Sequence, residues 1–391
     1  MKVRVQQSAI AGEVAALSGS VLSSSAMQGG LPGIRLRAEG QTLVLEAYNA
    51  RDHAELTVAA EVEVEGSIVV AADKAFPALI ASLTGQDLVL EGDRGGSTLR
   101  IEAKGSEYSV PTLVAGDWPA FPDGDEHSAL CSVEPQALLL GIQRASKAAA
   151  ANETRRPIFE GLLLDISGDG VVLSATDSRR ISVRRVPARG VSGEAACVVH
   201  ARSLGVLGKM SRLLTAGGDV SVTIDGSRRV SFEQPGRLRL SMAVMGDASK
   251  FPNLSNVVPK EYAVDLVFDR RELLAAHKRA SLFVGDAYTN PLVLAISDLG
   301  VLEIAADKSS ATVGTARETL AAVETLKFEP DESYHIALNT RFLADGLGLV
   351  DGDGVRLRCT AGNTQIAMIT EAESDPERDR EFYLAVAVRV G

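Results

Sequence analysis

Acidic and basic side chains adjoin one another at a point where their types could support acid–base chemistry. Asp177 is followed by Ser178, Arg179 and Arg180, which places one carboxylate beside two guanidinium groups. The sequence supplies no nucleophile or second base to complete a catalytic set around it. Asp also suits a tight turn, because its carboxylate bonds nearby backbone N–H groups. A structural turn is therefore the stronger interpretation of Asp177.

Metal-ligating and catalytic motifs are scarce in the remainder of the chain. The run D-G-D-G at 351–354 resembles the start of a calcium loop but lacks the later ligands and the bidentate Glu. A hairpin turn explains it fully. The histidines are scattered and form no HExxH motif; they are His53, His127, His200, His277 and His335. We therefore expect no catalytic residues, no metal site and no cofactor, and an enzyme built on this chain would need a constellation that the sequence lacks.

Basic residues recur on the segments that we expect to be helical. Arg144 and Lys147 are three residues apart, as are Lys209 and Arg212, so each pair lies on one helical face. The set also includes Lys278 and Arg279 on a third such segment, and Arg155 and Arg156, which follow the helix expected over 134–151. Solvated helix faces would explain any single pair. Their recurrence favours a shared surface that contacts phosphates without reading sequence.

The elements that carry these residues repeat along the chain. LVLEAYNARDHAELTV around Asn49, VVLSATDSRRISV around Asp177 and LEIAADKSSATV around Asp307 each join two strand-like runs through a polar turn. The three turn positions lie 128 and 130 residues apart. Trp118-Pro119 and Phe251-Pro252 show a similar spacing of 133 residues. One period of roughly 130 residues indicates three copies of one unit, each the size of a domain.

Each unit is expected to hold two helices packed on antiparallel strands. Helices are predicted over residues 8–22 and 71–83, 134–151 and 201–214, and 269–283 and 340–349, with Ser203 near an N-cap. Hairpin-like runs without strand–helix–strand alternation separate them, which is typical of an α+β fold. The predicted domains are residues 1–124, 125–259 and 260–391.

Composition sets further bounds on the class of protein. The 391 residues carry a formal net charge of −11 and 46% hydrophobic residues. No apolar run approaches the roughly 18 residues of a membrane span, and the first residues lack the apolar core of a signal peptide. The isolated cysteines Cys131, Cys197 and Cys359 suit a reducing compartment. We expect a cytoplasmic protein whose acidic surface disfavours tight, nonspecific nucleic-acid binding.

These features together resemble the bacterial DNA polymerase III β subunit, the sliding clamp. The resemblance covers the whole chain and rests on the three units, YSVPTLVAGDWPAFP, RPIFEGLLL…ATDSRRISV, KFPNLSNVVP and the terminal strand ending in VRVG. It implies a non-enzymatic processivity factor and a head-to-tail homodimeric ring of six similar domains that encircles duplex DNA. Because topology would retain the DNA, an acidic exterior is compatible with this function. The resemblance also implies that helices line the hole, so the eight basic residues named above would be DNA-facing.

The resemblance also implies a pocket that receives short peptide motifs from the replicative polymerase, the clamp loader and repair proteins. Carried over by motif, its residues are Phe159, Thr176, Ser178, Arg179, Arg180, Ile181, Pro252, Val257, Leu384, Val386, Ala387, Val388 and Arg389. In the family's dimer contact, Tyr108 and Val110 of one subunit would meet Leu282 and Phe283 of the other. No membrane partner is implied.

Departures from the family pattern leave two alternatives open. Ser178 stands where a glycine is usual, and Val386 and Ala387 replace a Met-Pro pair. These changes suggest a specialised second clamp whose reshaped pocket selects particular partners or escapes an inhibitor. The other alternative is a ring scaffold that is not loaded on DNA.

Overall fold

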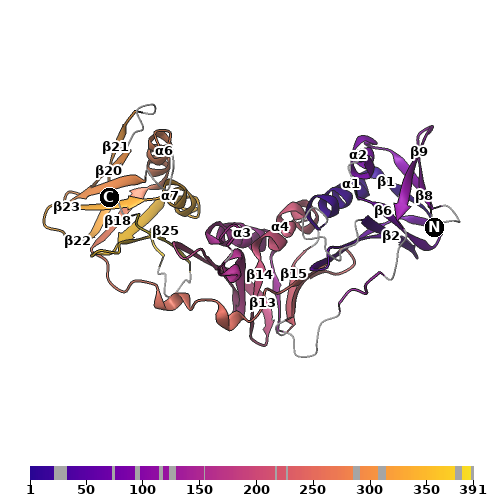
Figure 1. The fold of residues 1–391 in the computed structure, drawn as a ribbon, viewed down its shortest axis with the longest axis horizontal. Helices are drawn as coiled ribbons and strands as arrows, with labels where there is room; N and C mark the ends of the chain where they lie inside the picture. The colour runs from indigo at the N-terminus through magenta and orange to yellow at the C-terminus, as the bar shows by residue number, and fades with distance from the viewer. Residues whose placement is uncertain are drawn as a thin grey trace. The chain divides into compact units, whose positions relative to one another are not determined.

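The computed structural model describes residues 1–21, 33–72, 75–92, 97–113, 118–122, 129–153, 155–215, 218–225, 228–284, 291–306, 314–374 and 381–388 (Figure 1). Contacts between Cα atoms divide the chain into two compact units. The first unit comprises Met1–Gln143, Gly161–Val171 and Val186–Lys250, and the second comprises Arg144–Glu160, Val172–Arg185 and Phe251–Gly391. The division into three domains at 124 and 259 stays a prediction.

The first unit is built on an antiparallel ribbon of strands that pair edge to edge. The order of pairing is β5-β1-β7-β8-β9-β6-β2-β3-β4-β17-β16-β15-β10. The strands are β1 (Lys2–Gln6), β2 (Gly33–Glu39), β3 (Thr42–Tyr48), β4 (Asp52–Ala59), β5 (Glu61–Val64), β6 (Gly66–Ala71), β7 (Asp87–Gly92), β8 (Thr98–Ala103), β9 (Ser106–Leu113), β10 (Ala129–Val133), β15 (Val220–Asp225), β16 (Arg229–Gln234) and β17 (Leu238–Ala243). A further pair joins β11 (Gly161–Ser167) to β14 (Ala195–His200).

Short helices pack on this ribbon. Helix α1 (Gln7–Ala16) continues as a π-helical turn (Leu17–Val21) and lies against α2 (Ala75–Ser82), as Figure 1 shows. Helix α4 (Ala201–Lys209) is followed by α5 (Ser211–Thr215). Helix α3 (Pro135–Ala145) and the strands β12 (Gly170–Thr176) and β13 (Arg180–Ser192) cross the boundary between the two units.

The second unit contains two antiparallel sheets. One has the order β22-β18-β24-β25-β26 and then the first residues of β13, and the other has the order β21-β20-β19-β23. The strands are β18 (Val264–Asp269), β19 (Leu292–Ser297), β20 (Val301–Ala306), β21 (Ala316–Ala321), β22 (Glu324–Phe328), β23 (Ser333–Leu338), β24 (Gly354–Cys359), β25 (Ile366–Glu371) and β26 (Phe382–Val386).

Two helices and the two sheets share one hydrophobic core in this second unit. Helix α6 (Arg270–Ser281) contributes Leu273, and α7 (Thr340–Leu347) contributes Phe342 and Leu343. Phe268 of β18 and Leu294 of β19 reach the same core from different sheets. Burial of these side chains away from water is the main force that holds the layers together. The α+β class and the antiparallel sheets predicted from sequence are confirmed.

The repeated turns have the same hydrogen bonds in the two copies that the structure describes. Asn49 Oδ1 accepts from the amides of Arg51 and Asp52 at 3.0 and 2.7 Å. Asp177 Oδ1 accepts from the amides two and three residues on at 2.9 and 3.0 Å. The residues that follow, Ala50 and Ser178, have φ values of 69° and 70°. The third copy, at Asp307, lies outside the described residues.

The strand that leaves each turn pairs with the last strand of the next repeat. In the first unit β4 pairs with β17, and His53 lies opposite Ser241. In the second unit the start of β13 pairs with β26, and Ile181 lies opposite Leu384. The internal repeat is thus a repeat of tertiary pairing and not only of local turns.

Several predicted helix ends are wrong. The helix predicted over 134–151 ends earlier, as α3 followed by a 3₁₀ turn (Ser146–Ala148), and Asn152 has a φ of 57°. The N-cap of α4 is His200, whose Nδ1 accepts from the Arg202 amide, and Ser203 instead donates to Asp52 at 2.9 Å. Within the described part of the chain, no helix has the length and apolar character needed to cross a membrane.

Candidate functional site

The turn at residues 176–180 is locked by side chains as well as backbone. Thr176 Oγ1 donates to the Arg180 carbonyl at 2.8 Å and accepts from the Ser178 amide at 3.1 Å. Asp177 accepts from two backbone amides through Oδ1 and from Arg180 Nε through Oδ2 at 2.8 Å. Both oxygens of this carboxylate therefore serve the turn, which supports the structural interpretation of Asp177.

Arg180 ties the turn to α7. Its Nη1 donates to Asp345 Oδ2 at 2.6 Å, and its guanidinium lies 4.4 Å from the centre of the Phe342 ring. Burial works to lower the pKa of Arg180, but the neighbouring Tyr383 and Asp177 more than offset it, so the pKa lies above its ordinary value. This charged, half-buried network holds the rim of an adjacent pocket in place.

An apolar pocket of about 200 Å³ opens beside this turn, wholly within the second unit. Ile181 and Leu384 form a cross-strand pair in its wall, and Ile366 pairs with Val386 next to them. The Val386 amide donates to the Arg179 carbonyl at 2.8 Å, which fixes the edge of β26 against β13. The described residues that line it are Arg156, Phe159, Thr176, Ser178, Arg179, Arg180, Ile181, Pro252, Leu254, Val257, Ile366, Leu384 and Val386.

Two short 3₁₀ turns close the other sides of this pocket. Phe159 lies in the turn Pro157–Glu160 and is 5% exposed, with the Arg156 guanidinium 5.6 Å from its ring centre. Leu254 begins the turn Leu254–Asn256, and Val257 follows it with 43% of its surface exposed. A partly exposed valine at the mouth and a buried phenylalanine deeper in give a cleft that suits an apolar side chain.

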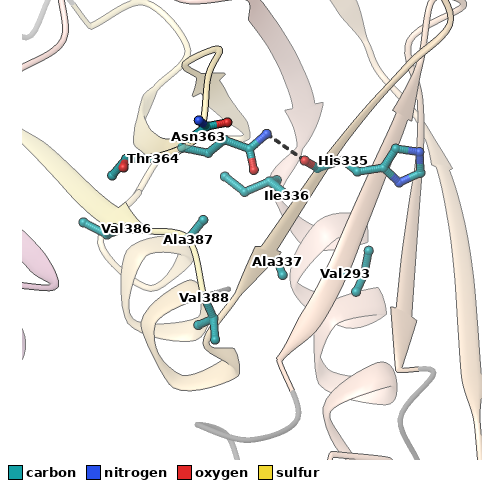
Figure 2. A pocket seen from close by; sticks show the side chains of 10 residues that line it. Val293, His335, Ile336, Ala337, Asn363, Thr364, Val386, Ala387 and Val388 are labelled. Carbon is teal, nitrogen blue, oxygen red and sulfur yellow. Dashed lines mark hydrogen bonds between the residues drawn. The ribbon is translucent and has the colours of Figure 1, made fainter. Parts of the chain in front are cut away.

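A second cavity of about 800 Å³ adjoins the first, because Val386 lines both. Figure 2 shows its walls: Val293 and His335 to Ala337 on one side, Asn363 and Thr364 on another, and Val386 to Val388 along the chain end. Gln365 Nε2 donates to the His335 carbonyl at 2.8 Å, and the Val388 amide donates to the Ala337 carbonyl at 2.8 Å. The chain thus passes from β26 onto the edge of β23.

The structure brings together most of the residues predicted for the peptide pocket. Ten line the smaller pocket: Phe159, Thr176, Ser178, Arg179, Arg180, Ile181, Pro252, Val257, Leu384 and Val386. Ala387 and Val388 line the larger cavity instead, and Arg389 lies outside the described residues. Their role in peptide binding stays a prediction.

The sequence reasoning missed two lining residues and placed a third elsewhere. Leu254 lies three residues before Val257 between two prolines, and this spacing could have indicated a shared face. Ile366 had no comparable signal, because its pairing with Val386 depends on the register of two strands. Arg156, one of the predicted DNA-facing residues, lines the pocket.

Several of the predicted DNA-facing side chains already have carboxylate partners. Arg144 forms a two-contact pair with Asp351, and Arg279 forms one with Glu318 at 2.8 and 2.6 Å. Hydrogen bonding from Arg144 lowers the pKa of Asp351. Lys147 Nζ lies 3.6 Å from Asp345, and Lys209 Nζ donates to the Gly19 carbonyl. Arg155, Arg212 and Lys278 are exposed. Contact of this set with DNA stays a prediction.

The predicted dimer residues lie on β9 and at the end of α6. Tyr108 is half-buried and Val110 is 9% exposed, both in β9. Leu282 is 74% exposed directly after α6, whereas Phe283 packs partly against the core of the second unit. An exposed leucine of this kind is consistent with an interface, and the pairing stays a prediction.

The D-G-D-G run behaves as a turn. The amides of Asp351 and Gly352 donate to the Glu371 carboxylate at 2.6 and 3.0 Å, and the Asp353 carbonyl accepts from the Arg270 amide at 2.8 Å. The loop leads directly into β24. The carboxylate of Asp351 accepts a hydrogen bond from Arg144. These contacts agree with the interpretation of this run as a hairpin turn.

Comparison with known proteins identifies this arrangement. The family description "DNA polymerase III beta subunit, central domain" matches residues 132–253, and the corresponding C-terminal domain matches residues 255–379. A "Beta sliding clamp" from Streptomyces coelicolor is 27% identical over the full length of both chains. One from Synechococcus elongatus is 26% identical over 84% of each chain.

Solved structures share the whole fold. The sliding clamp of Bacillus subtilis superimposes with a TM-score of 0.86 at 20% identity, covering 100% of both chains. A sliding clamp from Pseudomonas aeruginosa, solved bound to griselimycin, gives a TM-score of 0.85 at 23% identity with the same coverage. Fold and comparisons define the class, a non-catalytic DNA sliding clamp. The chain belongs to the DNA polymerase III beta subunit family.

Proposed function

We propose that the 200 Å³ pocket beside β13 and β26 is where this sliding clamp receives short apolar peptide segments of its partners. The partners would be the replicative polymerase, the clamp loader and repair proteins. The observation that carries the proposal is the pocket itself, in which Phe159, Ile181 and Leu384 present carbon surface beneath a partly exposed Val257. A leucine or phenylalanine of a bound peptide would remove that surface from water.

The rim of the pocket favours a peptide with an acidic residue near its apolar anchor. Arg156 and Arg179 both line the pocket, and its described lining residues include no Asp or Glu. A carboxylate on the peptide would meet positive potential there. The resulting contact would add selectivity to the apolar burial.

The remainder of the proposed function concerns DNA and assembly. Two chains would form a head-to-tail ring through β9 of one subunit and the end of α6 of the other, and the ring would encircle duplex DNA in the cytoplasm. The net charge of −11 fits retention by topology better than retention by phosphate contacts. The specialised clamp and the unloaded scaffold, set out as alternatives above, are not favoured by the comparisons.

Peptide titration tests the pocket. We expect Val257→Ala to weaken binding of a fluorescent Leu- and Phe-bearing clamp-binding peptide by about 1 kcal/mol, because a wall of the anchor site is truncated. Phe159→Ala should weaken it by about 1–3 kcal/mol. Anisotropy measured at fixed salt gives both values.

A matched control distinguishes the loss of a pocket contact from the truncation of any exposed valine. Val323→Ala removes the same two methyl groups from a valine that is 72% exposed in the same unit but outside the pocket, so peptide affinity should not change. Equal affinities for wild type, Val257→Ala and Phe159→Ala would refute the pocket assignment. Griselimycin competition in the same assay would show whether this pocket accepts a ligand seen with a related clamp.

A further inference from the structure

A charged cluster lies on the first-unit counterpart of the peptide pocket. Glu46 of β3 lies directly opposite Glu55 of β4, and His53 lies opposite Tyr48 in the same register. Residues two apart on a strand share a face, so Glu46, His53 and Glu55 face the same side of the sheet. One ligand atom from each, a ring nitrogen and two carboxylate oxygens, lies within 4.8 Å of the other two.

His53 is buried in this cluster without a hydrogen bond at one nitrogen. Its side chain is 1% exposed, and its Nε2 has no hydrogen-bond partner among the described residues. The rings of Tyr48 and Phe121 pack beside the imidazole, with centroids 5.6 and 4.9 Å from its centre. An ordinary imidazole is largely neutral at pH 7 and then keeps a lone pair that can bind a metal ion. A buried polar nitrogen without a partner is costly unless something binds it.

The fold does not require these residues. Counting from the equivalent turn residues, Glu46, His53 and Glu55 correspond to Ser174, Ile181 and Val183 in the second repeat. Those three neutral side chains occupy the same strand positions beside an equivalent strand pairing. The first repeat could therefore keep its fold with uncharged side chains, and two carboxylates placed directly opposite one another destabilise a sheet. Arg35, Arg37 and Arg239 offset part of that repulsion, and a bound cation would offset more of it.

The surrounding arginines leave room for a cation. Arg37 and Arg35 contact Glu46 at 2.8 and 3.2 Å, one on each oxygen, and Arg239 contacts Glu55 Oε2 at 3.3 Å. A carboxylate offers about four lone-pair sites, so these contacts and a metal ion can share it. Arg37 also pairs with Glu39, and Arg239 with Glu233. Arg229 also acts on His53, so the set holds four carboxylates and four arginines, a net charge of 4 − 4 = 0, and an ion would be held by its direct ligands and not by excess negative charge.

We propose that Glu46, His53 and Glu55 bind one divalent transition-metal ion, with zinc the best match, on the first-unit face equivalent to the peptide pocket. A neutral imidazole and two carboxylates form a ligand set that zinc accepts, with water completing the coordination. The site joins β3 to β4 beneath the segment that carries Phe121. This proposal differs from the expectation, based on the sequence, of no metal site. The proposed metal site is also separate from the DNA sliding-clamp function.

Zinc binding by the full-length chain tests the proposal. After treatment with a chelator and removal of the chelator, isothermal titration with zinc chloride should give about one ion per chain. X-ray absorption of the loaded protein should show nitrogen and oxygen ligands without sulfur, which distinguishes this site from binding by Cys131, Cys197 or Cys359. Sulfur in the first shell, or no binding heat at neutral pH, would overturn the proposal.

Substitutions locate the ion. Glu55→Gln keeps the shape of a half-buried side chain and should weaken zinc binding at least about tenfold, as should His53→Gln. His335→Gln alters an exposed histidine of the second unit and should leave affinity unchanged. Circular dichroism establishes that each variant is folded. Unchanged zinc affinity in folded Glu55→Gln and His53→Gln would place the ion elsewhere and refute the assignment.

Discussion

At the scale of single residues, the most informative position is Ser178, which lines the proposed peptide pocket. Its φ of 70° lies in the left-handed region that favours glycine, and Ala50 has nearly the same value in the equivalent turn. The turn tolerates both because Asn49 and Asp177 bond the following amides in the same way. The strained backbone of Ser178 therefore lies at the site where we propose that a partner peptide binds.

We expect Ser178→Gly to raise the free energy of unfolding by up to about 1 kcal/mol, because glycine relieves the left-handed strain at some entropic cost. Urea unfolding measures the change. Ala50→Gly should raise the free energy of unfolding by a similar amount, because the two turns have the same backbone conformation. Ser192→Gly, at the exposed end of β13, should lower stability by roughly 0.5–1 kcal/mol. Loss of stability in Ser178→Gly would contradict the strain assigned to this turn.

At the scale of elements, α6 and α7 are joined by a buried histidine. His277 of α6 is 5% exposed, and its Nε2 lies 3.0 Å from the Thr340 carbonyl at the start of α7. Burial lowers the pKa of His277, partly offset by that backbone hydrogen bond. The contact holds together the two helices that complete the core of the second unit.

Stability of this helix pair should therefore depend on pH. Above about 6.5, His277 is neutral in the folded and unfolded chains and has no effect. As pH falls below that value the unfolded chain binds a proton that the folded chain resists, so stability decreases until the folded pKa is passed. One such group contributes at most about 1.4 kcal/mol per pH unit.

Urea unfolding between pH 7.5 and 5.5 checks this expectation. The decrease should be smaller in His277→Gln, which has no titrating ring, and unchanged in the control His335→Gln. An identical pH profile in wild type and His277→Gln would show that other groups account for the dependence.

At the scale of the whole molecule, charge and assembly determine how the clamp would hold DNA. The chain carries a net charge of −11, and three of the eight predicted DNA-facing residues, Arg144, Lys147 and Arg279, are paired with Asp351, Asp345 and Glu318. Positive charge already paired within the chain contributes less to phosphate binding. A closed ring, rather than electrostatic affinity, must then account for retention on DNA.

Closure of that ring should depend on Leu282, which is 74% exposed after α6. We expect Leu282→Asp to convert dimers into monomers, because a buried unpaired charge would be introduced into the proposed interface. Analytical ultracentrifugation measures the state, and retention on nicked circular DNA should be lost with it. Leu299→Asp, at a leucine 83% exposed in the β19–β20 turn, should remain dimeric. A Leu282→Asp dimer as stable as wild type would place the interface elsewhere.

The sequence by itself determined the repeat, the α+β class and the polar turns, because these depend on local spacing and on side chains that bond their own backbone. Asp177 and its neighbours form the predicted turn for that reason. The family resemblance added most of the pocket, since its residues lie in recognisable motifs. Neither source indicated Ile366, or the cluster of Glu46, His53 and Glu55.

Only the tertiary structure decided those features. The turn at residues 176–180 becomes the rim of a pocket because β13 pairs with β26, roughly 200 residues further along the chain. The register of such distant strands is set by which side chains the shared core can bury, and a shift of one residue would reverse every face. The equivalent pairing in the first unit joins β4 to β17 and places His53 opposite Ser241. His53 therefore occupies the position that the apolar Ile181 occupies in the second unit.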